Sequence, residues 1–147
     1  MLARRELSAE GVRARLQDRG FPSDVIESTL ARLTESGVVD DRRVAQAYAR
    51  TAVAVKGRGR MRVIRELQGM GIDSAIVAEA VGQVFGDIDE RTLIAKALQK
   101  KLRGRPPMKD PREQARLYQY LMRQGFTPAA VAAALRRLRG GRGADQE

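Results

Sequence analysis

The sequence contains no cysteine, no histidine and no tryptophan. Without cysteine the chain has neither disulfides nor thiol nucleophiles. Because histidine is absent too, the chain lacks the imidazole base of many enzymes and the usual ligands of transition metals. We therefore expect a protein that is not an enzyme and that holds no metal and no cofactor.

Long apolar runs are also absent. A membrane-spanning helix requires about 18 apolar residues in a row, and no such stretch occurs. The first residues, MLARRELSAEG, lack the apolar centre of a signal peptide. The sequence therefore predicts a cytoplasmic protein that makes no contact with a membrane.

Positive charge is what the chain has in excess. It holds 28 lysines and arginines against 18 aspartates and glutamates among 147 residues, so its formal net charge is +10. This balance favours binding to polyanions or to acidic protein surfaces.

One segment occurs three times along the chain. The copies VRARLQDRGFPSDVIESTLARL, VIRELQGMGIDSAIVAEAVGQV and LYQYLMRQGFTPAAVAAALRRL begin at Val12, Val63 and Leu117, so they align without gaps at offsets of 51 (63 − 12) and 54 (117 − 63) residues. Such self-similarity is typical of repeat architectures. The matching columns are Leu16, Leu67 and Leu121; Gly20, Gly71 and Gly125; Phe21, Ile72 and Phe126; Ile26, Val77 and Val131; and Leu30, Val81 and Leu135.

The glycine column predicts how the first helix of each copy ends. A helix ending at Arg19 places Gly20 where a left-handed backbone is needed and brings Phe21 next to Leu16. This pattern indicates a Schellman turn, after which a second helix begins. We expect the same turn at Gly71 and Gly125, with Phe21 and Phe126 as core residues.

A third helix is predicted after the first and second copies. Asp40 and Asp89 are suited to cap these helices, because each follows an apolar residue and precedes a helical pattern. Asp40 and Asp41 also resemble a catalytic or magnesium-binding carboxylate pair, but the start of a helix explains both. RGRPPMKDPREQ is the one plausible linker, and Asp110 in it is expected to cap the next helix.

These elements predict an all-α fold of about eight helices, arranged as an elongated, curved array of tandem three-helix repeats. Each repeat has too little apolar surface to be stable alone, so neighbouring repeats must stack. The predicted boundaries are 1–55 for the first repeat, 56–105 for the second, 106–139 for an incomplete third repeat of two helices, and 140–147 for a disordered tail.

The positive charges are concentrated in two tracts without acidic residues, each leading into the first helix of the next repeat. Because stacked repeats place equivalent positions alike, we expect the two tracts to form a continuous basic face. The first tract holds Lys56, Arg58, Arg60, Arg62 and Arg65, and the second holds Lys96, Lys100, Lys101, Arg103, Arg105 and Lys109.

Two interpretations of the tracts stay open. Cations near a helix C-terminus are favoured by the helix dipole even without a ligand, which accounts for Lys100, Lys101 and Arg103. Alternatively, Gly57 and Gly59 between the cations let a phosphate backbone approach closely. A nucleotide-binding P-loop is disfavoured, because KGRGR lacks its spacing and a preceding strand.

Tyr120 falls in the column of Arg15 and Glu66, which predicts a solvent-facing position. An aromatic ring there suits stacking on a base or contact with a neighbouring repeat. Tyr120 is therefore a further candidate binding residue.

Residues 37–72, GVVDDRRVAQAYARTAVAVKGRGRMRVIRELQGMGI, resemble the signature region of the RecX family of bacterial regulatory proteins. The resemblance rests on Gly-x-x-Asp-Asp-x-Arg from Gly37 to Arg43, on Lys-Gly-x-Gly from Lys56 to Gly59, and on Leu-x-x-x-Gly-Ile ending at Ile72. It continues to YLMRQGFTPAAV and covers nearly the whole chain.

The resemblance implies a modulator of the RecA recombinase, made of tandem three-helix repeats that lie in the groove of the RecA–DNA filament. Such a protein restrains filament extension, strand exchange, ATP hydrolysis and coprotease activity in recombination, DNA repair and the SOS response. The implied partners are the RecA filament and single-stranded DNA, with double-stranded DNA left open, and we expect a monomer. The basic tracts and Tyr120 are then candidates for contacting RecA, DNA or both.

Two other functions compete with this one. An autonomous DNA-binding protein without a protein target is the main alternative, and its affinity would fall steeply with salt. A carboxylate-metal phosphodiesterase is disfavoured because the acidic residues are dispersed or cap helices.

Overall fold

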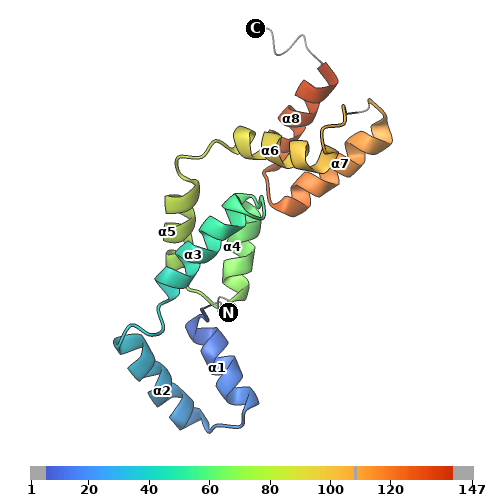
Figure 1. Ribbon diagram of the computed structural model, residues 1–147. Coiled ribbons are helices and arrows are strands. Elements are labelled where there is room, and N and C mark those ends of the chain that lie inside the picture. The colour runs from blue at the N-terminus through green and yellow to red at the C-terminus, as the bar shows by residue number, and fades with distance from the viewer. Residues whose placement is uncertain (1–5, 108, 141–147) are drawn as a thin grey trace. The chain divides into compact units, whose positions relative to one another are not determined.

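The structure, a computed structural model, describes residues 6–107 and 109–140. Within these residues it contains eight α-helices and no strand, which confirms the predicted all-α repeat fold (Figure 1). No helix of the described part is long and apolar enough to cross a membrane. The helices are α1 (Ala9–Asp18), α2 (Ser23–Glu35), α3 (Asp41–Ala54), α4 (Arg60–Gly69), α5 (Ser74–Phe85), α6 (Glu90–Leu102), α7 (Pro111–Gln124) and α8 (Pro128–Gly140).

The chain forms two compact units whose boundaries cut across the sequence repeats. Unit 1 comprises Met1–Thr51 and Ile64–Val84, and unit 2 comprises Ala52–Val63 and Phe85–Glu147. In unit 1, α1 packs against α2, and in unit 2, α6, α7 and α8 pack against one another. The repeat boundaries near residues 55 and 105 stay a prediction, and most of the predicted tail, residues 141–147, lies outside the described residues.

All three predicted Schellman turns are present. Gly20, Gly71 and Gly125 have φ angles of 84°, 76° and 102°, in the left-handed region. The backbone N–H of the following residue donates to the leucine carbonyl five residues earlier, at N···O distances of 3.2 Å from Phe21, 3.4 Å from Ile72 and 3.3 Å from Phe126. The glycine column therefore ends the first helix of each repeat.

The second and third turns are each covered by the start of the preceding repeat. In unit 1 the Ser8 hydroxyl donates to the Met70 carbonyl at 2.8 Å, and Glu10 fills the space beside Gly71. In unit 2 the Gly59 N–H donates to the Gln124 carbonyl at 2.6 Å, and the start of α4 lies against Gly125. Ser8 and Gly59 are equivalent positions, as are Met70 and Gln124, so equivalent positions meet in each unit, through a side-chain hydroxyl in unit 1 and a backbone N–H in unit 2.

The first turn lacks this cover, and the prediction that Phe21 is a core residue is wrong. Its side chain is 47% exposed, whereas Ile72 and Phe126 in the same column are 4% and 1% exposed. Apart from Gly20 and its two chain neighbours, no described residue has an atom within 4 Å of a Cβ placed on Gly20. The burial of this column therefore depends on a segment from the preceding repeat, which the Schellman turn itself does not supply.

The predicted aspartate caps Asp40, Asp89 and Asp110 accept backbone hydrogen bonds at the starts of α3, α6 and α7. Asp40 Oδ1 accepts from the backbone N–H groups of Arg42 and Arg43, and Asp89 and Asp110 each accept from the residue two positions on. Asp41 instead accepts from the backbone N–H of Ala9 at 2.9 Å, so it satisfies the start of α1 rather than of its own helix. Both members of the Asp40–Asp41 pair are thus occupied in backbone hydrogen bonds.

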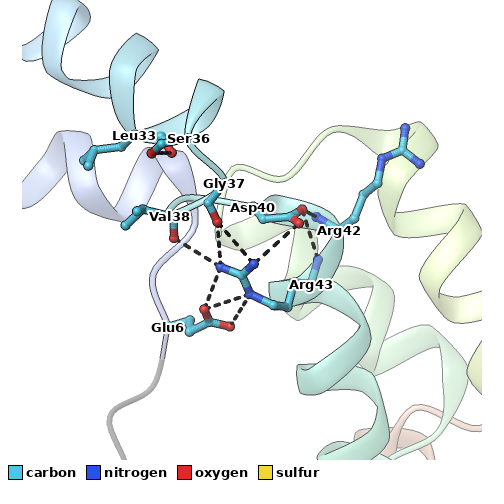
Figure 2. A network of polar contacts seen from close by, with 8 residues as sticks. All are labelled: Glu6, Leu33, Ser36, Gly37, Val38, Asp40, Arg42 and Arg43. Carbon is cyan, nitrogen blue, oxygen red and sulfur yellow. Dashed lines mark hydrogen bonds and ion pairs between the residues drawn. The ribbon is translucent and has the colours of Figure 1, made fainter.

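Arg43 is the centre of a polar network that joins three parts of unit 1 (Figure 2). Its guanidinium donates to the carbonyls of Gly37 and Val38, at 3.1–3.2 Å, and to the carboxylate of Glu6. The hydrogen bonds with Glu6 raise the pKa of the Arg43 guanidinium above its usual value. The Gly-x-x-Asp-Asp-x-Arg motif therefore fixes the turn between α2 and α3 and the segment before α1.

Because only a planar guanidinium satisfies these acceptors together, we predict that Arg43→Lys lowers the Tm by a few degrees. Arg42→Lys is the matched control, since Arg42 makes a single hydrogen bond with an exposed carboxylate, that of Glu79. Thermal unfolding followed by circular dichroism compares the two variants. Equal Tm values would contradict the assignment of this network as a stabilising feature.

Candidate functional site

A groove of about 740 Å³ in unit 2 collects most of the predicted binding residues. Three segments line it: the C-terminal end of α3 with the loop after it, one face and the C-terminal end of α6, and the last turns of α7. Its lining is Val53, Ala54, Val55, Lys56, Gly57, Leu93, Lys96, Ala97, Lys100, Lys101, Arg103, Arg105, Tyr120 and Gln124.

The charge of the groove has a single sign. Six of its lining residues are lysine or arginine and none is acidic. Lys96, Lys100 and Lys101 are exposed on α6, and none of them forms an ion pair with a carboxylate of the described residues. Cations that lack an internal counter-charge and lie around one hollow attract a ligand with several negative charges.

The groove also has apolar surface, part of which is aromatic. Tyr120 is half-buried, and the Lys101 ammonium lies 4.8 Å from the centre of its ring, within the range of a cation–π contact. Valine, alanine and leucine side chains from α3 and α6 complete the lining. The groove therefore offers both cations and a flat apolar surface to a ligand.

Arg103 lines the groove and has an unusual backbone conformation. Its φ of 53° and ψ of 41° place it in the left-handed region, and it is the one non-glycine residue with a positive φ in the described chain. A left-handed conformation costs an L-residue about 1–2 kcal/mol, which glycine avoids. Arg105 Nε donates to the Leu102 carbonyl at 3.1 Å, so this cation closes the end of α6.

The first basic tract is not part of the groove as a whole. Only Lys56 lines the groove, while Arg58 and Arg62 are half-buried and donate to the Gln124 side-chain oxygen at 3.4 and 3.2 Å. Arg60 lies over the ring of Phe85, 5.7 Å from its centre. The two other candidates are elsewhere: Arg65 belongs to unit 1, and Lys109 is exposed outside the groove lining.

The expectation that Gly57 and Gly59 both admit a phosphate backbone is corrected for Gly59. Gly59 is buried, and a Cβ on it would lie 2.6 Å from the Gly125 carbonyl and 2.8 Å from the Phe126 ring. The close approach that requires a glycine here is made by the chain itself. Gly57, with a φ of 63°, does line the groove.

Gln124 is a site residue that the sequence analysis missed. It is only 9% exposed, and its side-chain amide donates to the carbonyls of Lys56 and Gly57, each at 3.3 Å. The sequence carries one signal for it: the three repeats differ in this column, where the positions equivalent to Gln124 hold Arg19 and Met70.

No group of three or more aspartates, glutamates, histidines or cysteines in the described residues is arranged to hold a metal ion. A second cavity, of about 420 Å³, lies in unit 1 beside Asp40 and Asp41, whose carboxylates already accept backbone hydrogen bonds. The basic groove is therefore the candidate site of the described chain.

Sequence models of the three RecX three-helix domains match residues 1–33, 40–81 and 89–135 of this chain. "Regulatory protein RecX" of Pasteurella multocida is 33% identical over 133 residues, which cover 90% of this chain and 79% of that protein. The protein of the same name from Chromohalobacter salexigens is 33% identical over 136 residues, or 92% of this chain and 86% of the relative. The Geobacillus kaustophilus relative is 32% identical, and the match spans only 49% of its length.

Two solved structures have a similar fold. A crystal structure of regulatory protein RecX superposes with a TM-score of 0.74 at 19% identity, over 89% of this chain and 64% of the other. A structure of RecX from Lactobacillus salivarius gives 0.71 at 21% identity, over 90% and 85% of the two chains.

The left-handed Arg103 leads to a prediction that separates stability from binding. Because glycine adopts this backbone without strain, Arg103→Gly should raise stability by about 1 kcal/mol, or the Tm by about 2–4 °C. The same change removes a groove cation, so it should weaken binding to a single-stranded oligonucleotide, measured by fluorescence anisotropy.

Arg103→Lys is the control, since it keeps the charge and the strained backbone and should bind as the wild type does. A lower Tm for Arg103→Gly, or binding equal to the wild type, would contradict this account of Arg103.

Proposed function

Because this chain belongs to the RecX family of regulatory proteins, we propose that it binds the RecA–DNA filament and restrains RecA activity. Binding reduces filament extension or stability, and strand exchange, ATP hydrolysis and coprotease activity fall with it. The protein acts by binding and performs no chemistry of its own.

The observation that carries this proposal is the acid-free groove of unit 2. Six cations from two separate tracts of the sequence line it, and Tyr120 adds an aromatic surface. A RecA–DNA filament presents DNA phosphates and acidic protein surfaces, which are both complementary to such a groove. Repeated weak contacts along a filament add to a strong attachment, because each further contact is made within one complex.

An autonomous DNA-binding protein remains the second candidate, since the same groove suits a free strand. The two functions differ in what the protein recognises. A filament modulator binds the RecA–DNA filament more tightly than it binds DNA alone, whereas a plain DNA-binding protein does not distinguish them. Binding of a plain DNA-binding protein also falls with salt in proportion to the phosphates that it contacts.

The first test measures the RecA ATPase rate on single-stranded DNA, with the protein added before and after filament assembly. The triple variant Lys96→Ala, Lys100→Ala and Lys101→Ala should need far more protein for the same inhibition. The increase is on the order of 100-fold near 0.1 M salt if each lysine contacts one phosphate. Circular dichroism should show unchanged helicity, because alanine is a good helix former.

The matched control is Arg15→Ala, Arg19→Ala and Arg32→Ala, which removes three exposed cations from unit 1 and so loses the same charge. It should inhibit nearly as the wild type does. Equal effects of the two triple variants would mean that net charge alone drives binding. Inhibition that scales with coated DNA and disappears with salt would favour the plain DNA-binding protein.

A further inference from the structure

We infer that Gln124 is a positioning residue of the groove: its amide holds the loop that carries Lys56, so that Lys56 and the cations of α6 form one site for the phosphates of a single DNA strand. This inference rests on the proposed function, because it assigns the DNA strand of the filament to the groove. It adds a residue whose role is to place a cation rather than to contact the ligand.

The amide of Gln124 joins four groups around it. Its nitrogen donates to the carbonyls of Lys56 and Gly57, and its oxygen accepts from the guanidinium groups of Arg58 and Arg62. Reversing the amide would set its NH₂ against two guanidinium groups and its oxygen against two carbonyls, so the acceptors and donors around it determine one orientation. The four distances lie between 3.2 and 3.4 Å, so each hydrogen bond is long. The loop is therefore held by the four contacts acting jointly and not by any one of them.

The chain on either side of Lys56 is fixed at other points. The Arg58 N–H donates to the Ala52 carbonyl at 2.9 Å, which closes the end of α3, and the Gly59 and Met61 N–H groups donate to the carbonyls of Gln124 and Gly125. Between these two anchors, the carbonyls of Lys56 and Gly57 have Gln124 as their side-chain donor. Removing the amide therefore releases the part of the loop that lines the groove.

Neither equivalent position in the other repeats could do this. Met70, in this column, has a thioether side chain with no N–H to donate, and Arg19 is exposed. A glutamate at position 124 would still accept from Arg58 and Arg62 but would repel the two carbonyls. Only a side chain with a donor and an acceptor at one end fits between the loop and the two arginines.

The lining of the groove favours a nucleic-acid strand as its occupant. Lysines and arginines suit consecutive phosphates, and the half-buried Tyr120 offers a ring on which a base stacks. An acidic segment of a protein would use the cations but would have no need of the aromatic surface.

The test compares Gln124→Met, Lys56→Ala and the double variant in full-length protein, by fluorescence anisotropy with a labelled oligothymidylate at several salt concentrations. Each single variant should weaken binding about fivefold at 0.1 M salt and reduce the salt slope by about 0.7, the value of one phosphate contact on a single strand. If Gln124 acts through Lys56, the double variant binds as Lys56→Ala alone does.

Gln119→Met is the control, because Gln119 is exposed on the same helix and lies outside the groove lining. Should Gln124→Met fail to fold, Gln124→Glu provides a second variant that keeps the length of the side chain and its contacts with the two arginines. Because release of the Lys56–Gly57 segment loosens the anchor next to it, hydrogen exchange of the Arg58 amide should accelerate in either Gln124 variant and not in the control. That measurement reports the release of the loop without any ligand.

The inference is overturned if Gln124→Met binds as the wild type does, or if the two single variants multiply to about 25-fold in the double variant, which is the product of two independent contacts. If the wild type inhibits RecA but does not bind the oligonucleotide, the groove takes an acidic protein surface, so this inference fails while the proposed function stands. If the wild type does neither, the proposed function fails and this inference with it.

Discussion

The contact on which the rest of the structure depends is made between the start of one repeat and the first turn of the next. It includes the hydrogen bond from the Ser8 hydroxyl to the Met70 carbonyl in unit 1, and those from the Gly59 and Met61 N–H groups to the Gln124 and Gly125 carbonyls in unit 2. The residue after each covered turn is buried, and the residue after the uncovered turn, Phe21, is exposed. In unit 2 the same contact brings the loop after α3 against α7, and so it creates one side of the basic groove.

The elements that the sequence predicted well are those determined by neighbouring residues. A Schellman turn needs a glycine and an apolar residue within one short segment, and an aspartate caps a helix from two or three residues away. The helix order, the three turns at Gly20, Gly71 and Gly125, and the capping role of Asp40 all depend on such local patterns. Because these local patterns recur at fixed offsets, each copy of the repeat supports the prediction made for the other two.

What the sequence could not predict depends on segments that are far apart along the chain. The exposure of Phe21 follows from what covers a turn, and Gly59 serves a contact with residues more than sixty positions later. The first basic tract divides for the same reason, since Lys56 lines the groove while Arg58 and Arg62 hold Gln124. A charge pattern identifies the residues that bear the charge, but only the packing determines which of them meet around one hollow.

The interleaving of the two units has a consequence for synthesis of the protein on the ribosome. Unit 1 takes in residues 64–84, so its core is incomplete while only the first repeat has emerged, although that repeat already encodes three helices. Residues 52–63 leave the ribosome early but belong to unit 2, which is completed only by α8. At a synthesis rate of about 5–20 residues per second, α7 is completed several seconds after the loop that bears Lys56. The nascent chain therefore completes the segments of unit 1 before it can form the basic groove.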